Sequence, residues 1–345
     1  MKIVVASSFV PFAYGGGRFI VEWLTERLRA EGHAVERIYL PFVDDPATML
    51  EQTLAYRLVD VAQSADRLIA IRPPAHVIPH PNKVVWFIHH FRTFYDLWDS
   101  DFRPVPDRPE SHALRRRLWR MDDVALREAR RILTISEVVA KRLRDFNRVP
   151  SEVVYPPLHR PEQFRCDGYG DEILCFSRVE YHKRQDLLIE AMRFVRSPVK
   201  LRLCGTGLSP GYHSALLGIV ERHGLGDRVT IDYRWVSEAE KIELFATALA
   251  IAYVPLDEDG VGYPALEAAP ARKAVVTTSD SGAVIELMEA GVNGEVVPPD
   301  AAAIAEAFDH LYFDRARARR MGEAHAERVS SMNITWDRVL ERMLG

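Results

Sequence analysis

The chain has 345 residues, of which 48% are hydrophobic and 27% charged, and its formal net charge is −4 at pH 7. This composition is typical of a folded globular protein and excludes an intrinsically disordered chain. The length favours two domains of ordinary size over a single core. The weak negative charge, without an overall basic field, argues against a nucleic-acid-binding protein.

Cysteine usage and hydropathy indicate the compartment. The three cysteines, Cys166, Cys175 and Cys204, lack C-x-x-C spacing and cannot all pair with one another. Such usage favours small buried side chains in a reducing compartment. No run approaches the roughly 20 apolar residues of a membrane span, and the opening residues MKIVVASSF are typical of a first strand, not of a signal peptide. We expect a cytoplasmic protein, and a peripheral contact with the inner face of the plasma membrane stays open.

The first half alternates short, β-rich apolar runs with longer segments of helical periodicity. After the first run, Ile20, Leu24 and Leu28 recur at helical spacing, and Gly32 lies where a helix C-cap is expected. This alternation predicts βαβ units and a parallel sheet. The predicted strands are KIVVA, VERIYL, RLIAI, KVVWFI, RILTI and EVVY.

The alternation stops in YPPLHRPEQFRCDGYG, a segment with three prolines and two glycines, and then restarts. The predicted fold class is α/β, with two Rossmann-like, doubly wound parallel-sheet domains facing an interdomain cleft. We place a first domain at 1–158, a linker at 159–170, a second domain at 171–322 and a C-terminal helix at 323–345 that packs back on the first domain. The predicted strands of the second half are DEILCF, VKLRLC, RVTID, ALAIAYV, KAVVTT and GEVV.

Residues that directly follow strands are the candidates for a site, because ligands of such sheets bind at the carboxyl ends of the strands. Gly15, Gly16 and Gly17 follow the first strand and precede a helix, where open backbone amides suit phosphate or sugar oxygens. The run is not G-x-G-x-x-G, so a tight strand-to-helix turn without a ligand is an equal alternative.

Two histidines, His89 and His90, follow the fourth strand. Either could orient a sugar or polarise a hydroxyl. If the strand continues, their side chains point to opposite sides, so at most one faces a cleft. The nearby aromatic residues favour a hydrophobic core over a sugar-stacking platform, and they are Phe87, Phe91, Phe94, Tyr95 and Trp98.

A basic cluster lies in the run LRRRLWRMDDVALREARRI. Its interleaved acidic residues favour a solvated helix with internal ion pairs. A contact with an anionic acceptor or a membrane surface is the alternative. The cluster consists of Arg115, Arg116, Arg117, Trp119 and Arg120.

Two cations follow the first strand of the second half. Arg178 and Lys183 flank a strand-to-helix turn, and the positive end of the next helix points to the same place. This convergence suits a diphosphate, with two solvated charges as the alternative. Gly205 and Gly207, in CGTGL after the next strand, offer a close backbone approach.

The acidic stretch DEDGVGYPALEA follows the strand ALAIAYV. Asp259 and Glu267 are eight positions apart, on either side of a turn at Gly260 and Gly262. The carboxylates could hold two hydroxyl-bearing parts of one ligand, and the glycines could admit it. Capping of the following helix by acidic residues is the alternative.

Taken together, the chain resembles the large family of retaining GT-B glycosyltransferases that use nucleotide-diphosphate sugars, the family 4 type with an E-x7-E signature. The resemblance implies an acceptor-side first domain and a donor-binding second domain. It also implies a hexosyltransferase acting on a glycan, a glycolipid precursor or a small-molecule acceptor, as in polysaccharide biosynthesis. The resembling segments run nearly end to end: GGGRFIVEWLTERLRAEGHAV, ARRILTISEVVAKRL, FSRVEYHKRQDLLIEAM and DGVGYPALEAAPARKAVVTTSDSGAVIELMEAGVNGEVVPPD.

The resemblance assigns roles to the residues of the second half. Arg178 and Lys183 would hold the donor diphosphate, Glu267 the ribose hydroxyls and Asp259 the sugar ring. The glycines at positions 15–17 would meet the phosphates or the acceptor. The implied donor-binding set is Gly15, Gly16, Gly17, Arg178, Lys183, Gly205, Gly207, Asp259, Gly260, Val261, Gly262, Tyr263 and Glu267.

The resemblance also places a histidine beside the reacting sugar, His89 in the first instance. A turn formed by Asp280, Ser281 and Gly282 resembles a second sugar-facing element. The implied catalytic set is His89, His90, Asp259, Arg178 and Lys183.

The chain departs from the family pattern at two positions, with Asp259 in place of the usual Glu and Val261 in place of the usual Phe. A catalytically idle GT-B protein that binds a nucleotide or sugar as a partner or regulatory module is therefore the alternative function. We expect no metal and no cofactor, because no D-x-D occupies a metal-binding role and the family needs none. The expected partners are a UDP- or GDP-linked sugar donor and an acceptor, with a monomer or weak dimer in solution.

Overall fold

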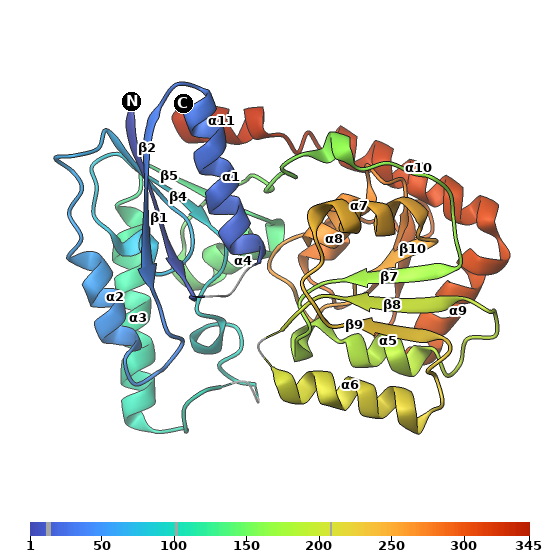
Figure 1. Cartoon of the computed structure of the whole chain (residues 1–345). Coiled ribbons are helices and arrows are strands. Elements are labelled where there is room, and N and C mark those ends of the chain that lie inside the picture. Colours follow the sequence, from blue (N-terminus) through green and yellow to red (C-terminus); the bar gives the residue numbers. More distant parts are fainter. Residues whose placement is uncertain (12–14, 101–102, 208) are drawn as a thin grey trace. The chain divides into compact units, whose positions relative to one another are not determined.

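The computed structural model describes residues 1–11, 15–100, 103–207 and 209–345 (Figure 1). Two compact units make up the chain. The first comprises Met1–Pro157 together with Thr335–Gly345, and the second comprises Leu158–Ile334. Each unit is built on a six-stranded parallel sheet.

The sheet of the first unit has the strand order β2-β1-β3-β4-β5-β6. Its central strands are buried on both faces, which explains why they read as continuous apolar runs and not as an alternating pattern. Neighbouring strands pair in parallel, with Ile3 opposite both Val35 and Arg67. The strands are β1 (Lys2–Phe9), β2 (Ala34–Pro41), β3 (Arg67–Ala70), β4 (Lys83–Phe87), β5 (Arg131–Thr134) and β6 (Glu152–Val153).

Helices connect these strands. In α1, the side chains of Ile20, Leu24 and Leu28 are buried, as their spacing predicted. Gly32 follows the helix with φ +81°, a conformation that favours glycine and ends the helix. The helices of this unit are α1 (Gly16–Ala30), α2 (Met49–Arg57), α3 (Pro109–Arg127), α4 (Glu137–Arg142) and α11 (Trp336–Leu344).

The C-terminal segment differs from the single helix predicted at 323–345. The helix α10 (Arg315–Ser331) ends, Asn333 adopts a left-handed conformation, and Thr335 caps the separate helix α11 through its hydroxyl. Trp336 packs edge-on against Trp86 of β4, and the guanidinium of Arg67 donates to the carbonyl of Met343. These contacts hold α11 against the strands of the first unit.

The sheet of the second unit has the order β12-β11-β10-β7-β8-β9. Since the order runs in opposite directions on the two sides of the β7–β10 pair, right-handed crossovers place helices on both faces. The strands are β7 (Glu172–Phe176), β8 (Lys200–Cys204), β9 (Val229–Asp232), β10 (Ala250–Ala252), β11 (Ala274–Thr278) and β12 (Gly294–Val297).

The helices of the second unit alternate with these strands and pack on a core of buried aliphatic residues such as Leu188, Leu201 and Phe308. They are α5 (Gln185–Ala191), α6 (Pro210–Arg222), α7 (Glu238–Thr247), α8 (Tyr263–Ala268), α9 (Ala301–Phe313) and α10.

The predicted fold class is confirmed, because every predicted strand is present and both sheets are parallel. The ends of two strands differ from the prediction. The ladder of β6 contains only Glu152–Val153, and β10 contains only Ala250–Ala252 of the seven-residue run ALAIAYV. None of the helices formed by the described residues is long and apolar enough to cross a membrane.

Candidate functional site

The strand order of the second sheet reverses between β7 and β10, and a ligand of such a sheet binds outside the carboxyl ends of these two strands. Arg178 follows β7 and is exposed. Lys183 closes the short turn η5 (Tyr181–Lys183) before α5 and is buried. The two cations predicted to hold a diphosphate therefore lie at the predicted edge of the sheet, but in different environments.

The ammonium of Lys183 is engaged within the protein. It donates to the Tyr253 hydroxyl at 3.0 Å and forms an ion pair with Glu258. Burial acts to raise the pKa of Glu258, but Lys183, with smaller contributions from His182 and Arg178, holds it below its ordinary value. The ion pair and the hydrogen bond thus hold the Lys183 side chain in place.

Sequence reasoning gave Glu258 no role of its own, because the residue lies between two other acids in the stretch DED. The signal that it is special comes from the backbone. Its N–H and C=O pair with the 280–283 turn, where Ala283 donates to the Glu258 carbonyl at 2.9 Å. Gly282 has φ +64°, and a Cβ there would lie 2.4 Å from the Glu258 nitrogen, so only glycine fits.

The polar side chains of the turn at 280–282 have hydrogen-bond partners within the protein. The Asp280 carboxylate accepts two hydrogen bonds from the Arg184 guanidinium, each of 2.7 Å. The Ser281 hydroxyl is buried and lies 2.7 Å from the hydroxyl of Thr278. These side chains are bound within the protein, and a sugar-facing role of the turn stays a prediction.

The glycines of the second unit serve close contacts within the protein. Gly262 has φ +78°, and a Cβ there would lie 2.2 Å from the ring of Tyr253. A Cβ at Gly205 would lie 2.0 Å from the Ser177 carbonyl, and one at Gly207 would lie 2.0 Å from the Val179 carbonyl. The glycines therefore allow neighbouring loops of the protein to approach each other closely. This contact places the 205–207 loop beside Arg178.

The remaining residues of the acidic stretch differ in burial. Asp259, Gly260 and Tyr263 are half-buried, whereas Val261 is fully buried and so contributes to the core of the turn. A direct contact of the Val261 side chain with a donor is not compatible with this burial.

Glu267 lies on α8 and is buried. Its Oε1 atom accepts a hydrogen bond of 2.5 Å from the Nζ atom of Lys241 on α7. Burial raises the pKa of Glu267 to about 7, although Lys241 acts to lower it. Sequence reasoning missed Lys241, because nothing in the pattern of its helix distinguishes it from a solvated lysine.

In the first unit, Gly15 caps α1, and Gly16 and Gly17 form its first turn. The Gly15 carbonyl accepts hydrogen bonds from the amides of Arg18 and Phe19. The preceding part of this loop, residues 12–14, lies outside the described residues. The glycines do begin a helix of four turns, as an anion-binding helix start requires.

The two histidines after β4 have different surroundings. His90 is only 2% exposed, and its Nε2 atom lies 2.8 Å from the side-chain oxygen of Asn147. Its ring packs against Phe87 and Tyr95. His90 is thus part of the core of the first unit, which argues against the catalytic contact predicted for it.

His89 is half-buried, and its Nδ1 atom lies 2.7 Å from the carbonyl oxygen of His90. A carbonyl can only accept, so Nδ1 carries the proton and Nε2 keeps a lone pair. Burial lowers the pKa of His89 to about 3, so the ring is neutral at physiological pH. Of the two histidines, His89 is the one that can accept a hydrogen bond from a hydroxyl group.

The aromatic residues after β4 are core residues, as favoured from the sequence, since Phe94, Tyr95 and Trp98 are all buried. Arg115 of the basic cluster contacts this core: its guanidinium lies 4.3 Å from the ring centre of Trp119 and donates to the Phe94 carbonyl. The other arginines of the cluster, on α3, are exposed, and they are Arg116, Arg117 and Arg120.

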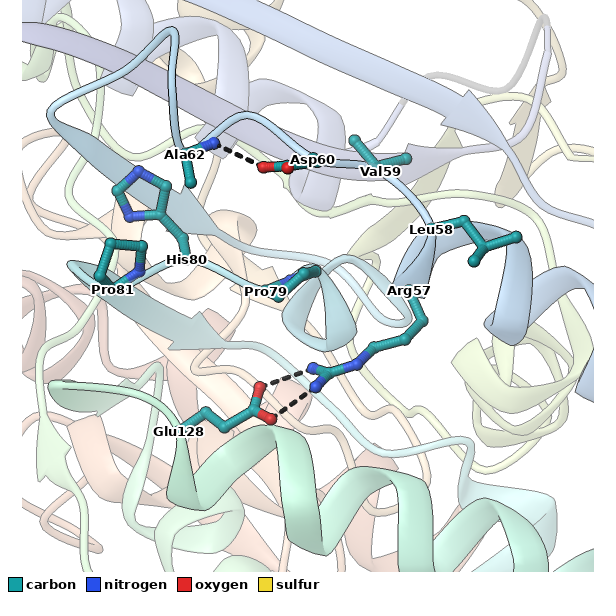
Figure 2. Close-up of a pocket in the computed structure, with 9 residues that line it drawn as sticks. All are labelled: Arg57, Leu58, Val59, Asp60, Ala62, Pro79, His80, Pro81 and Glu128. Carbon is teal, nitrogen blue, oxygen red and sulfur yellow. Dashed lines mark hydrogen bonds and ion pairs between the residues drawn. The ribbon is translucent and has the colours of Figure 1, made fainter.

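A surface hollow of about 530 Å³ lies between the end of α2 and the start of β4 (Figure 2). The guanidinium of Arg57 reaches across it to both carboxylate oxygens of Glu128, with two hydrogen bonds of 2.6 Å. None of the predicted site residues lines this hollow. Its main charges neutralise each other, so it is not a candidate for an anionic donor.

Comparison with known proteins finds a family match within the second unit. Residues 162–328 match the family described as Glycosyl transferases group 1. The matched residues include the loops and the helix at the β7–β10 edge.

A curated relative matches over part of its length. The lipopolysaccharide core biosynthesis mannosyltransferase LpcC of Rhizobium leguminosarum bv. viciae is 32% identical over 155 residues. The match covers 43% of this chain and 43% of that protein, so this chain aligns with less than half of the relative.

Solved structures match over the whole chain. Sucrose-phosphate synthase from Thermosynechococcus elongatus has a TM-score of 0.80 at 18% identity, covering 99% of this chain and 97% of its own. Anabaena HepE in complex with UDP-glucose has a TM-score of 0.75 at 16% identity, covering 100% and 98%. At such identities the likeness establishes the fold, which is the GT-B fold of two Rossmann-like domains.

Proposed function

We propose that this protein is a retaining, metal-independent hexosyltransferase that uses a nucleotide-diphosphate sugar. The acceptor in this proposal is a hydroxyl group of a glycan, a lipid-linked precursor or a small molecule. One observation carries the proposal: Arg178, Lys183 and Glu267 lie on loops and a helix that follow β7 and β10, within the residues that match the family Glycosyl transferases group 1.

In this proposal, Arg178 and Lys183 bind the diphosphate and stabilise the charge that develops as the sugar–phosphate bond breaks. Arg178 is exposed and can offer two parallel N–H donors. Lys183 is held by Tyr253 and Glu258 before any donor arrives. A side chain that is already held in place loses less conformational entropy when the diphosphate binds, so more of the interaction is left to stabilise the transition state.

The two carboxylates have separate roles. Glu267 accepts hydrogen bonds from the ribose hydroxyls, and half-buried Asp259 accepts them from the transferred sugar. The name of the LpcC relative supports mannose as the sugar, whereas HepE was solved with UDP and UDP-glucose. Both sugars are hexoses, and we propose a UDP- or GDP-linked donor.

The proposed reaction keeps the configuration at the anomeric carbon. The acceptor oxygen attacks the face from which the diphosphate leaves, the C–O bond to the phosphate breaks, and the acceptor proton passes to a leaving phosphate oxygen. No side chain then acts as general base. The neutral ring of His89 fits a role as acceptor of a hydrogen bond from a sugar hydroxyl, because its Nε2 atom carries a lone pair.

The exposed arginines of α3 support an anionic partner for the first unit. Within the described residues, Arg116, Arg117 and Arg120 have no acidic partner. We propose that they contact an anionic acceptor or the phosphate groups of a membrane surface. Sedimentation with vesicles that contain anionic lipid tests the membrane contact. Replacement of the three arginines by glutamine should abolish the binding of the protein to these vesicles.

The activity is tested by incubating the purified chain with labelled UDP-glucose, UDP-galactose, GDP-mannose and ADP-glucose in the presence of EDTA. A transferase should release sugar slowly to water from one of them, even without its acceptor. Arg178→Ala should reduce this release. Binding of a nucleoside diphosphate without release from any donor would support the catalytically idle alternative, which the shorter carboxylate at Asp259 motivates.

A further inference from the structure

The buried carboxylate of Glu267 depends on one cation. Its Oε1 atom lies 2.5 Å from the Nζ atom of Lys241, and the exposed fractions of the two side chains are 7% and 11%. In the part of the chain that the structure describes, Lys241 is the hydrogen-bond partner of this carboxylate and no second one is present. The two residues come from adjacent helices, α7 and α8 (Figure 1).

The ammonium of Lys241 is itself held in place. It also pairs with Glu238 at 2.9 Å, on the solvent side of α7. The rings of Phe164 and Phe176 lie with their centres 5.6 and 5.7 Å from the nitrogen. Burial acts to lower the pKa of Lys241, but Glu267 and Glu238 together hold it above its ordinary value, so the group stays charged.

Glu267 is close to losing its charge. Burial raises its pKa to about 7, and this value already includes the opposing effect of Lys241. The other charged or titratable groups near it are Glu238 on α7, which disfavours a second negative charge, and Tyr263 at the start of α8. His325 on α10 faces α8 but contacts the Ala265 carbonyl. Without Lys241, the Glu267 carboxyl would therefore be protonated at neutral pH.

We propose that Lys241 is a positioning residue for the sugar donor: its ammonium keeps the Glu267 carboxylate charged and aimed at the ribose hydroxyls. This inference rests on the proposed function, in which Glu267 binds the ribose. A carboxylate accepts hydrogen bonds from both hydroxyls of a ribose, whereas a protonated acid offers fewer and weaker acceptors. Lys241 needs no contact of its own with the donor.

The proposal predicts a pH dependence that a structural role would not produce. In the wild-type protein, affinity for UDP or GDP should be full near pH 8 and fall as Glu267 takes up a proton around pH 7. In Lys241→Met, the same fall should occur at higher pH, so that affinity at pH 7 is about tenfold lower and recovers towards pH 9. Lys241→Arg should keep the wild-type affinity and profile.

The experiment is calorimetric titration of the full chain with UDP and with GDP from pH 6 to pH 9. Lys200→Met, at an exposed lysine at the start of β8, is the matched control and should behave as wild type. The glutamine side chain in Glu267→Gln cannot ionise. The pH dependence of the affinity in this variant therefore comes from the titration of the diphosphate itself. Adding Lys241→Met to Glu267→Gln should cause no further loss of affinity.

Two outcomes separate this inference from the proposed function. If Glu267→Gln binds UDP and GDP as wild type does, Glu267 does not bind the ribose and both proposals on this residue fail. If Glu267→Gln weakens binding but Lys241→Met weakens it equally at every pH, or adds to Glu267→Gln, the role of Lys241 is structural and only this inference fails. Should Lys241→Met not fold, Lys241→Gln removes the charge with a smaller change in packing and gives the same comparison.

Discussion

The ion pair between Lys183 and Glu258 allows a structural role of Lys183 to be separated from a functional one. Lys183→Met removes the cation and leaves Glu258 without its partner. Lys183→Met combined with Glu258→Gln removes both charges. If Lys183 binds the diphosphate, the double variant should regain stability without regaining donor use.

The magnitude follows from the burial of the pair. Removing one member of a buried ion pair costs about 3–5 kcal/mol of the free energy of unfolding. The Glu258 side chain is 23% exposed and also feels the charge of Arg178, so the lower end applies. We expect Lys183→Met to lose about 3 kcal/mol of unfolding free energy, and the double variant to lie within about 1 kcal/mol of wild type.

Donor use should follow a different pattern. Losing one group that stabilises developing charge costs about 2–3 kcal/mol of transition-state stabilisation, a factor of roughly 30 to 150 in kcat/KM. Both variants should show this loss, because neither has the Lys183 ammonium. Urea denaturation gives the stability, and release of labelled sugar from the donor gives kcat/KM.

Lys200→Met again serves as the control for replacing a lysine in this unit. Recovery of donor use in the double variant, together with its stability, would refute the diphosphate role of Lys183. Unchanged stability of Lys183→Met would instead show that the pair contributes little to the folded state.

Three further predictions follow from the same site and its surroundings. Turnover should persist in EDTA; if it stops and Mg²⁺ or Mn²⁺ restores it, the acidic stretch at 257–259 binds metal. Glu267→Gln should lower the affinity for free nucleoside diphosphate more than tenfold. Asp259→Asn should lower sugar transfer but leave that affinity unchanged, and Asp259→Glu should retain or raise activity. Equal losses of calorimetric affinity in Glu267→Gln and Asp259→Asn would refute this division of roles. Burial lowers the pKa of His325 to about 4, so on acidification the unfolded chain takes up this proton before the folded chain does. The contribution of His325 to the free energy of unfolding is therefore complete above about pH 6.5 and falls by about 3 kcal/mol towards pH 4. His325→Gln should flatten this loss in denaturation measured against pH, and His310→Gln, at an exposed histidine, should not.

The sequence by itself determined the α/β class and the position of the strands. Strands buried on both faces require uninterrupted apolar residues, and helices that cover a sheet require a 3.6-residue period, so both are visible in a linear pattern. The same logic selected Arg178, Lys183 and Asp259 as candidate site residues, because the carboxyl ends of strands are where ligands of such sheets bind. The predicted strand ends were less accurate. In ALAIAYV, Tyr253 and Val254 follow the short strand β10 and are buried although they lie outside it, so the apolar run is longer than the strand.

Only the tertiary structure decided how the site residues are paired. Glu258 and Lys183 are 75 positions apart, and Glu267 and Lys241 are 26 apart, so no local spacing connects them. The same holds for His90, whose hydrogen-bond partner Asn147 is 57 positions away. A charge or a hydrogen bond in the core is determined by which elements the fold brings together. For this reason the sequence could name the cations and carboxylates of the site, but the fold alone decided which of them hold one another.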